Sequence, residues 1–288
     1  MVEPAEQLFE VRGLRVVYRR PGAKPLEAVK GVDFTLAEGE TLGIVGESGS
    51  GKSTIAKTLL LLQPSSGGVA LFRGRNIAAF TAAERRQYRR DVQMVFQDAV
   101  GSLNPRMTIR QALNEILKTS LGGIRGRQEE EEPTLGGVRG RQSPRSLSHT
   151  PESLLSLVGL SKAVLDQYPR ELSGGQCQRA SFARALAVNP KVLVADEPVS
   201  ALDVSVQARI LNLMRDLRRE LGLAILLIAH DLSVVRNVCD RVCVMHRGLF
   251  EDAGPAEEVF DHPQSDYTKN LLAAVPDVRR SLAARTPR

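Results

Sequence analysis

The sequence predicts an α/β fold in which helices flank a mostly parallel β-sheet. Two strongly apolar runs, residues 192–195 and 223–229, have the length of buried strands, and a helical segment precedes each of them. A third apolar run, residues 41–45, leads into a glycine-rich loop and then into a predicted helix over residues 52–62. Such alternation is typical of βαβ units, in which a crossover helix joins neighbouring parallel strands.

An antiparallel layer is expected at the edge of this core. Residues 8–18 and 32–36 alternate loosely between apolar and polar side chains, which predicts two strands. Arg20, Pro21 and Gly22 predict a turn between them. Residues 92–96 are a further strand candidate.

The middle of the chain predicts helices rather than strands. After residue 96 no comparable buried strand occurs until residue 192, and helices are predicted over residues 105–118, 151–160 and 174–188. We therefore expect a helical subdomain over about residues 98–188, inserted between two halves of the sheet. The main domain is expected to cover residues 1–275, followed by a short basic tail over residues 276–288.

One segment within this subdomain has a different composition. The stretch LGGIRGRQ at residues 121–128 recurs as LGGVRGRQ at residues 135–142, with four consecutive glutamates between the copies. Gly, Arg, Glu, Ser and Pro dominate here and bury little surface, which predicts a flexible insertion over residues 121–150. It is either a regulatory or partner-binding loop or a surface duplication that the fold tolerates.

Composition limits the possible classes of protein. The chain has 288 residues, of which 42% are hydrophobic and only 4% aromatic, and Trp is absent. This favours an aliphatic α/β core over a β-sandwich. The net charge is +6, but the charges are scattered without a long basic block, so we expect no nucleic-acid partner.

Cysteine usage predicts a cytosolic protein, and hydropathy predicts no membrane-spanning segment. Cys177, Cys239 and Cys243 form no C-x-x-C pair, and their odd number predicts reduced thiols rather than disulfides or a zinc site. No apolar run reaches about 18 residues, so no transmembrane helix is expected. Residues 1–10 are acidic and lack an apolar segment, so we expect no signal peptide. Work at a membrane would need another chain to hold this one there.

A phosphate-binding loop follows the first buried strand. Residues 46–53 fit the pattern G-x-x-x-x-G-K-[ST] between a strand and a helix, where backbone N–H groups and the helix N-terminus attract phosphate. This predicts a P-loop nucleoside triphosphatase core, with Lys52 on the β- and γ-phosphates and Ser53 on Mg²⁺. The pattern does not identify the reaction, because kinases, GTPases and motors share it. The expected nucleotide contacts are Gly46, Glu47, Ser48, Gly49, Ser50, Gly51, Lys52, Ser53 and Thr54.

Polar residues follow the other predicted strands. Asp196 ends an apolar strand, so its carboxylate should emerge at the edge of the sheet where α/β proteins bind ligands, and we expect it to hold Mg²⁺. Glu197 comes next and can polarise the attacking water. His230 and Gln97 also follow strands. Tyr18 ends the first strand and is expected to stack on adenine; the alternative is an ordinary edge-strand tyrosine.

A second anion site is predicted at the start of the helix over residues 174–188. Ser173, Gly174 and Gly175 expose backbone donors at the positive end of that helix. The two helix starts can serve one nucleotide only if they approach it from opposite sides.

Together, residues 46–53, Gln97, 172–176, 196–197 and His230 resemble, in this order, the ATP-binding-cassette (ABC) ATPases over nearly the whole chain. The resemblance implies that residues 172–176, the signature motif, bind the γ-phosphate of ATP held by the opposite subunit, so that two cassettes enclose two ATP molecules.

The same resemblance implies a role for single residues. Gln97 links Mg²⁺ to the transmembrane partner, Glu197 is the general base, His230 is the switch histidine, and Asp203 belongs to the loop that crosses the dimer interface. Ser173, Gly174, Gly175 and Gln176 contact nucleotide.

Residues 102–108 and 262–268 resemble a narrower group, the ATPase subunits of oligopeptide, dipeptide and nickel importers. This implies an importer subunit for peptides or a related small solute such as nickel, acting on the cytoplasmic face of the inner (plasma) membrane. Implied partners are a second ABC ATPase, either a sister chain or a copy of this one, two membrane permeases and, indirectly, an extracytoplasmic solute-binding protein.

The chain departs from this group at several positions. Cys177 replaces the usual polar residue after the signature, and Ala99 and Val100 replace the usual proline and aromatic residue near the expected permease contact. No cysteine follows Cys243, so we expect no iron–sulfur cluster. The alternative function is a soluble ABC-type ATPase acting on nucleic acid or ribosomes. A P-loop kinase would leave residues 173–176 and His230 unexplained.

Overall fold

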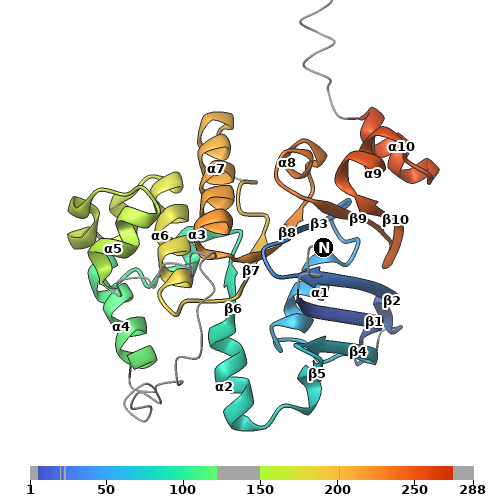
Figure 1. Ribbon diagram of the computed structural model, residues 1–288, viewed down its shortest axis with the longest axis horizontal. Helices are drawn as coiled ribbons and strands as arrows, with labels where there is room; N and C mark the ends of the chain where they lie inside the picture. The colour runs from blue at the N-terminus through green and yellow to red at the C-terminus, as the bar shows by residue number, and fades with distance from the viewer. Residues whose placement is uncertain (1–5, 20, 23, 122–149, 201, 275–288) are drawn as a thin grey trace, which may run out of the picture.

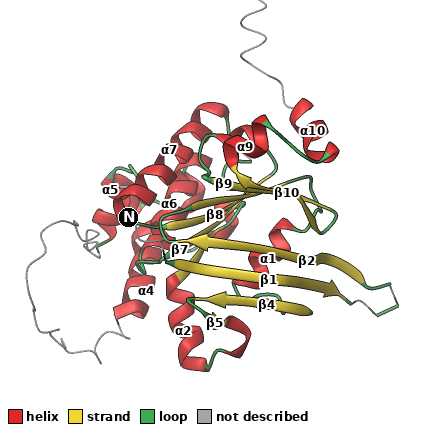
Figure 2. Cartoon of the chain, turned by 45° about the vertical axis from the view of Figure 1, so that its right-hand side comes forward, coloured by secondary structure: helices red, strands yellow, loops and turns green. Residues whose placement is uncertain are grey.

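The structure, a computed structural model, describes residues 6–274 except 20, 23, 122–149 and 201. It contains two sheets. One is four-stranded, in the order β2–β1–β4–β5, and the other is six-stranded, in the order β10–β9–β3–β8–β7–β6. Figure 2 shows helices α4 to α7 gathered at one side of the sheets. The predicted α/β class, with a separate antiparallel layer and a helical part between two strands of the parallel sheet, is confirmed.

The smaller sheet is antiparallel throughout. Its strands are β1 (Gln7–Tyr18), β2 (Leu26–Ala37), β4 (Gly67–Phe72) and β5 (Arg75–Asn76). The predicted start of the second strand at residue 32 was wrong, because the strand begins at Leu26 and pairs with β1 up to Tyr18. Gly31, with φ +97°, interrupts the alternation on which the prediction depended. Strands β4 and β5 were not predicted.

The larger sheet holds the predicted apolar runs at its centre. Strands β3 (Thr41–Val45), β8 (Ala224–Ala229) and β7 (Val192–Asp196) are parallel neighbours in which every residue is buried. The short strand β6 (Val92–Val95) pairs with β7 at one edge. At the other edge, β9 (Arg241–His246) runs parallel to β3, and β10 (Leu249–Pro255) pairs antiparallel with β9. Neither β9 nor β10 was predicted from the sequence.

Helices α1 (Lys52–Leu59), α2 (Ala82–Asp91) and α7 (Val204–Leu221) connect the strands. The helix after the phosphate loop ends at Leu59 rather than at residue 62, and Leu61 has φ +58°. Towards the C-terminus lie α8 (Leu232–Arg236), α9 (Ala256–Asp261) and α10 (Asp266–Ala273), all unpredicted, as was α2, whereas α7 is the helical segment expected before the apolar run at residues 223–229. No helix in the described part of the chain is long and apolar enough to span a membrane.

The described residues between β6 and β7 form only helices and 3₁₀ turns. These are α3 (Ala99–Ser102), α4 (Ile109–Leu121), α5 (Pro151–Leu157), the 3₁₀ turns Lys162–Asp166 and Pro169–Glu171, and α6 (Gly174–Leu186). Helix α4 starts at Ile109 rather than at residue 105, because Met107 N–H closes a turn onto the Asn104 carbonyl. Residues 122–149 of the predicted insertion lie outside the described part of the chain, as does the predicted tail over residues 276–288. The predicted domain boundaries therefore stay a prediction.

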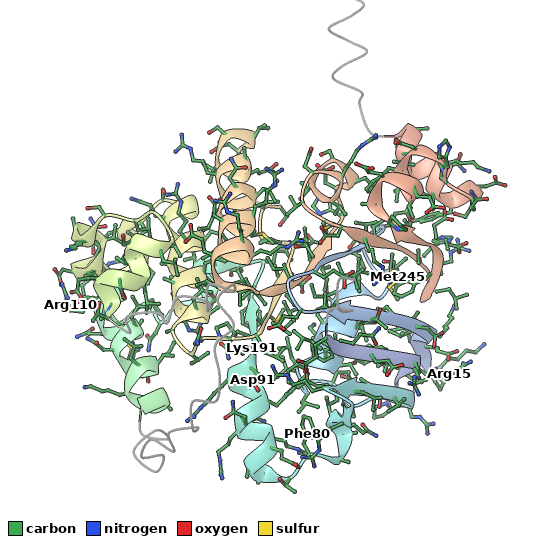
Figure 3. The ribbon with its side chains drawn as sticks, in the orientation of Figure 1. Arg15, Phe80, Asp91, Arg110, Lys191 and Met245 are labelled. Atoms are coloured by element: carbon green, nitrogen blue, oxygen red, sulfur yellow. The ribbon has the colours of Figure 1, made fainter. Side chains whose placement is uncertain are left out.

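Ion pairs and backbone contacts hold the helical part together. Arg110 of α4 pairs with Glu152 of α5 at 2.5 Å and with Asp166 at 2.9 Å (Figure 3). Lys191 N–H donates to the Asp91 carbonyl at 2.7 Å, just before β7 and β6 begin their parallel pairing (Figure 3). This bond aligns the residues that precede β6 and β7, in register with the Val92–Val192 pair that begins the two strands.

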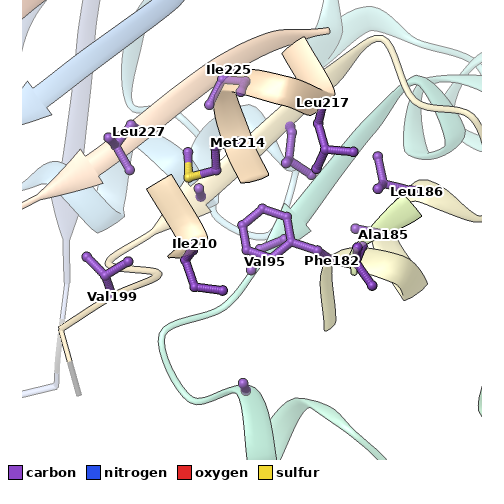
Figure 4. Close-up of a cluster of buried hydrophobic side chains, with 14 of the residues drawn as sticks. Val95, Phe182, Ala185, Leu186, Val199, Ile210, Met214, Leu217, Ile225 and Leu227 are labelled. Carbon is purple, nitrogen blue, oxygen red and sulfur yellow. The ribbon is translucent and has the colours of Figure 1, made fainter. Parts of the chain in front are cut away.

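Buried side chains cover both faces of the parallel sheet. On one face Phe182 of α6 packs with Ile210, Met214 and Leu217, the apolar stripe of α7, against residues of the strands (Figure 4). On the other face a second cluster joins β3 and α1 to the antiparallel sheet through Phe9 and its neighbours. The parallel strands are thus fixed from both sides, and their carboxyl ends form a rigid edge.

Candidate nucleotide-binding site

The predicted site residues meet at the carboxyl edge of the parallel sheet. The phosphate loop follows β3, Gln97 follows β6, Asp196 ends β7 and His230 follows β8. These four strands are adjacent and parallel in the order β3–β8–β7–β6. Adjacent parallel strands end on the same side, so residues far apart in the sequence come together there.

The path of the phosphate loop requires glycine at two points. Gly46 has φ +151°, and a Cβ there would lie 2.0 Å from the carbonyl oxygen of Met245 in β9 (Figure 3). Gly51 has φ +114°, and a Cβ there would lie 2.3 Å from the carbonyl oxygen of Ala28 in β2. The loop is therefore backed closely by main chain from both sheets, which leaves its concave face open for a ligand.

Lys52 is the first residue of α1 and is only 4% exposed. Its Nζ donates to the carbonyl oxygens of Gly46 and Glu47, each at 2.7 Å. Burial lowers the pKa of the ammonium, an effect that the nearby carboxylates of Glu197 and Asp196 oppose. A buried cation held by loop carbonyls is poised for a stronger anionic partner.

Ser53 and Asp196 are also brought together. The Ser53 hydroxyl donates to Asp196 Oδ1 at 3.1 Å. Burial raises the pKa of Asp196, which is 9% exposed. With the side-chain oxygen of Gln97, these are hard oxygen donors of the kind that Mg²⁺ prefers, so the predicted magnesium ligands fit that ion. No group of three or more His, Cys, Asp or Glu side chains that could hold a metal occurs in the described ranges.

Glu197 lies at the centre of a small polar cluster. Its backbone has φ +47°, and its N–H donates to the Ile228 carbonyl of β8 at 2.9 Å. The Glu197 Oε2 atom lies 3.3 Å from His230 Nδ1 and accepts from Gln97 Nε2 at 3.2 Å. Gln97 Nε2 also lies 3.2 Å from the hydroxyl of Ser200. This backbone turn aims the carboxylate away from Asp196, so the two neighbouring acids face different partners.

Tyr18 lies beside the phosphate-loop helix. Its hydroxyl is 3.3 Å from Thr54 Oγ1, and the side chain is half-buried. The contact brings the end of β1 to the first turn of α1. The ring is therefore near the predicted nucleotide site, while its stacking on adenine stays a prediction.

The signature residues form the exposed start of α6, away from the phosphate loop of the same chain. Ser173 and Gln176 form a reciprocal capping box, with Gln176 N–H donating to Ser173 Oγ at 3.3 Å and Ser173 N–H donating to Gln176 Oε1 at 2.9 Å. A Cβ on Gly175 would lie 2.6 Å from Val206 Cγ1 of α7. Figure 1 shows α6 among the helices on the left and α1 beside the sheets on the right.

Asp203 is the N-cap residue of α7. Its Oδ1 accepts from Val206 N–H at 3.0 Å and from the Ser205 hydroxyl at 2.7 Å. These hydrogen bonds, the Ser205 bond foremost, lower the pKa of the carboxyl. Asp203 thus has a local structural role, and the nucleotide contact predicted for it stays a prediction.

Two residues for which no role was predicted, Tyr267 and Gly248, touch the site, and so does Ser200, which opens the predicted interface loop that contains Asp203. Tyr267 Oη accepts from the N–H of Glu47 at 3.3 Å, and Gly248 N–H donates to the Ser50 carbonyl at 2.9 Å. Ser200 contacts Gln97 as described above. The stretch 262–268 had been singled out as a family resemblance, so a signal existed for Tyr267, but nothing in the local sequence indicates what it contacts.

Comparison with known proteins agrees with this geometry. The ABC transporter family matches residues 29–200. The oligopeptide transport ATP-binding protein OppF of Lactococcus lactis subsp. lactis (strain IL1403) is 46% identical over 251 residues, covering 87% of this chain and 73% of that protein. The dipeptide transport ATP-binding protein DppF of Lactococcus lactis subsp. cremoris (strain MG1363) is 42% identical over 278 residues, covering 96% of this chain and 83% of that protein.

A solved structure agrees as well. The dimeric post-hydrolysis state of the ATP-binding cassette MJ0796, bound to ADP and Pi, has a TM-score of 0.68 at 27% identity, covering 86% of this chain and 98% of that one. The resemblance predicted from the ordered motifs is confirmed. The chain therefore belongs to the ABC transporter family, as an ATP-binding and ATP-hydrolysing subunit akin to those of oligopeptide and dipeptide transporters.

Proposed function

We propose that this chain hydrolyses ATP to drive the import of short peptides through a membrane permease to which it binds. The observation that carries this proposal is the convergence of Lys52, the Ser53–Asp196 pair and the Glu197 cluster at one sheet edge. The peptide assignment is supported by the oligopeptide and dipeptide transport proteins to which the chain is similar over most of its length.

The phosphate loop binds the triphosphate. Backbone N–H groups of the loop after Glu47 and the start of α1 surround the phosphates, and Lys52 keeps its bond to the Gly46 carbonyl while its remaining N–H donors turn to phosphate oxygens. Tyr18, beside Thr54, contacts the adenine. Ser53, Asp196 and Gln97 hold Mg²⁺, which when bound neutralises charge on the phosphate oxygens.

Glu197 acts as general base on the attacking water. Gln97 Nε2 and His230 Nδ1 both approach Oε2, so the second oxygen, Oε1, is the one assigned to accept the proton from water. The two contacts orient the carboxylate before the water arrives. His230 follows β8 and Gln97 follows β6, so movement of either flanking segment changes the orientation of the base.

The signature residues act on the nucleotide of a partner cassette. The start of α6 offers the backbone N–H groups of Gly174 and Gly175, since those of Ser173 and Gln176 are held by the capping box, and it lies apart from the phosphate loop of its own chain (Figure 1). The MJ0796 cassette is dimeric in its ADP- and Pi-bound state, which supports a pair of cassettes here. The partner is either a sister ATPase or a second copy of this chain, and the close packing of Gly175 on Val206 links this surface to the Asp203 cap.

Two permease chains complete the proposed assembly at the cytoplasmic face of the inner membrane, with a solute-binding protein on the other side. The alternative of an ATPase acting on nucleic acid or ribosomes has less support, because both curated relatives described above are named as transport proteins. Peptides are favoured over nickel on the same ground.

Uptake measurements test this function directly. Disrupting the chain in its host should abolish uptake of labelled di- and tripeptides, and wild-type chain but not the Glu197→Gln variant should restore it. Uptake of a labelled free amino acid serves as control, and labelled nickel forms a separate arm. Undiminished peptide uptake in the disrupted strain, or loss of nickel uptake alone, would reject peptides as the solute.

A further inference from the structure

The C-terminal helix α10 reaches the phosphate loop through one side chain. The hydroxyl oxygen of Tyr267 accepts a hydrogen bond from Glu47 N–H at 3.3 Å, across a sequence separation of 220 residues. Glu47 is the second residue of the phosphate loop. The contact therefore joins the loop to residues 262–268, a stretch that has no role in the ATP hydrolysis described above.

The peptide group that Tyr267 contacts is also bonded to Lys52. The N–H of Glu47 and the carbonyl of Gly46 belong to the same planar peptide unit. Tyr267 holds its N–H end, and Lys52 Nζ donates to its C=O end at 2.7 Å. A hydrogen-bonded chain thus runs from the tyrosine oxygen through one peptide to the ammonium that binds phosphate. Because hydrogen bonds in series polarise one another, each bond supports the other.

The tyrosine is itself held firmly in place. Its ring stacks on His246 of β9 with centroids 4.0 Å apart and planes 10° apart. Two residues before it, Ser265 caps α10 through Thr268, which is fully buried. The Asp252 carboxylate accepts from the N–H groups of Gln264 at 3.2 Å and Ser265 at 3.1 Å. The two hydrogen bonds to Asp252 fix the start of α10 on β10.

We propose that Tyr267 is a positioning residue for ATP binding, which fixes the Gly46–Glu47 peptide so that Lys52 faces the phosphates. Without the hydroxyl, the N–H end of this peptide loses its partner, and the carbonyl that orients Lys52 is held less firmly. Tyr267 touches neither substrate nor reacting atoms in this role. The inference rests on the proposed ATP site at the phosphate loop.

The decisive variant is Tyr267→Phe in the full chain, because it keeps the ring on His246 and removes only the acceptor. Affinity for a fluorescent ATP analogue and for ADP should fall about three- to tenfold, which is the range that one net hydrogen bond supports. The KM for ATP should rise by the same factor while kcat changes by less than about twofold, since Lys52 binds ground and transition states alike. The Tm without nucleotide should match that of the wild type.

Two controls separate the possible explanations. Asp266→Asn changes the neighbouring residue on α10, whose side chain is 93% exposed, and should leave affinity and Tm unchanged. Lys52→Ala tests the ATP site itself. If Lys52→Ala binds the analogue like wild type, the proposed site is wrong and this inference falls with it. If Lys52→Ala weakens binding but Tyr267→Phe does not, only the role of Tyr267 is overturned. A lower Tm in Tyr267→Phe, with equal losses in kcat and affinity, also overturns it in favour of a purely structural role.

Discussion

His230 Nδ1 and Glu197 Oε2 lie 3.3 Å apart, although the 32 residues between Glu197 and His230 include α7 and β8. Gln97 Nε2 approaches the same carboxylate oxygen at 3.2 Å. The base is therefore held by side chains that follow two other strands, and its chemistry and its orientation can be tested separately.

Glu197→Gln should reduce Mg²⁺-dependent ATPase activity by about 10²–10⁴-fold, the range expected for loss of a general base. ATP affinity should change little, because the amide retains the shape of the side chain. Steady-state phosphate release and binding of the fluorescent analogue measure the two quantities. Glu258→Gln, exposed on α9, is the matched control and should be active. Turnover in Glu197→Gln near the wild-type rate would disprove the assignment.

Asp196→Asn should raise the Tm of the nucleotide-free chain at neutral pH while it abolishes most ATPase activity. Burial raises the pKa of Asp196, so its folded-state pKa lies above the unfolded value and the ionised form costs stability. That cost is present above the folded pKa and vanishes as the pH falls below the unfolded value. The Tm difference between variant and wild type should therefore shrink in acid.

Scanning calorimetry in metal-free buffer at several pH values measures this difference. Asp266→Asn, at an exposed position, should show no such pH-dependent gain. Activity should fall on the order of 10²-fold or more, because a metal-held transition state is worth several kcal/mol. A lower Tm for Asp196→Asn at neutral pH would mean that the Ser53 contact outweighs the burial of charge.

Gly175→Ala should destabilise the chain by about 1–3 kcal/mol, as expected for overpacking. The added Cβ would lie 2.6 Å from Cγ1 of Val206, a β-branched side chain with little freedom to move. Val206→Ala removes that atom, so the double variant should recover most of the stability lost by Gly175→Ala. Thermal unfolding of the four proteins in this cycle gives the coupling between the two sites. Additive losses would show that the two residues do not clash.

The cysteines should be unreactive in the folded chain. Burial raises the pKa of the Cys177 thiol, and it raises that of Cys243 to about 12. Both side chains are buried, and Cys177 Sγ donates to the Pro169 carbonyl at 3.3 Å. Thiol-reactive dyes at mildly alkaline pH should label Cys177 and Cys243 only after unfolding. Rapid labelling of native Cys177, mapped by peptide mass spectrometry, would contradict the packing of the signature helix.

Local patterns predicted the parts of the fold and site that depend on neighbouring residues. The continuous apolar runs of β7 and β8 are what a strand buried on both faces requires, and the glycines of the phosphate loop encode its turn. Helix α7 was predictable as well, since Asp203 caps it and Gly222, with φ +66°, ends it.

Long-range contacts were beyond such patterns. Strand β2 looked broken at Gly31 because a glycine with positive φ interrupts the alternation of apolar and polar residues. The strand nevertheless continues on both sides of Gly31 because it pairs with β1 there. The convergence of Gln97 with Glu197 followed from strand order, which the family resemblance implied but no local pattern encodes. The contact of Tyr267 with the phosphate loop could be identified only from the folded chain. Its partner is the backbone N–H of Glu47, and because every residue except proline has such a group, no side-chain pattern marks it.

The bond between Glu47 and Tyr267 also orders events during synthesis. The phosphate loop leaves the ribosome long before its support on α10 exists, because 220 residues separate the two partners. At about 5–20 residues per second, the loop waits roughly 10–40 s for that helix to be translated. For most of that time Gly46 also lacks β9 behind it, and the Ser50 carbonyl lacks its contact with Gly248. A nascent chain that has not yet reached α10 thus carries the phosphate loop without its support, and full ATP affinity arises only once α10 has been translated.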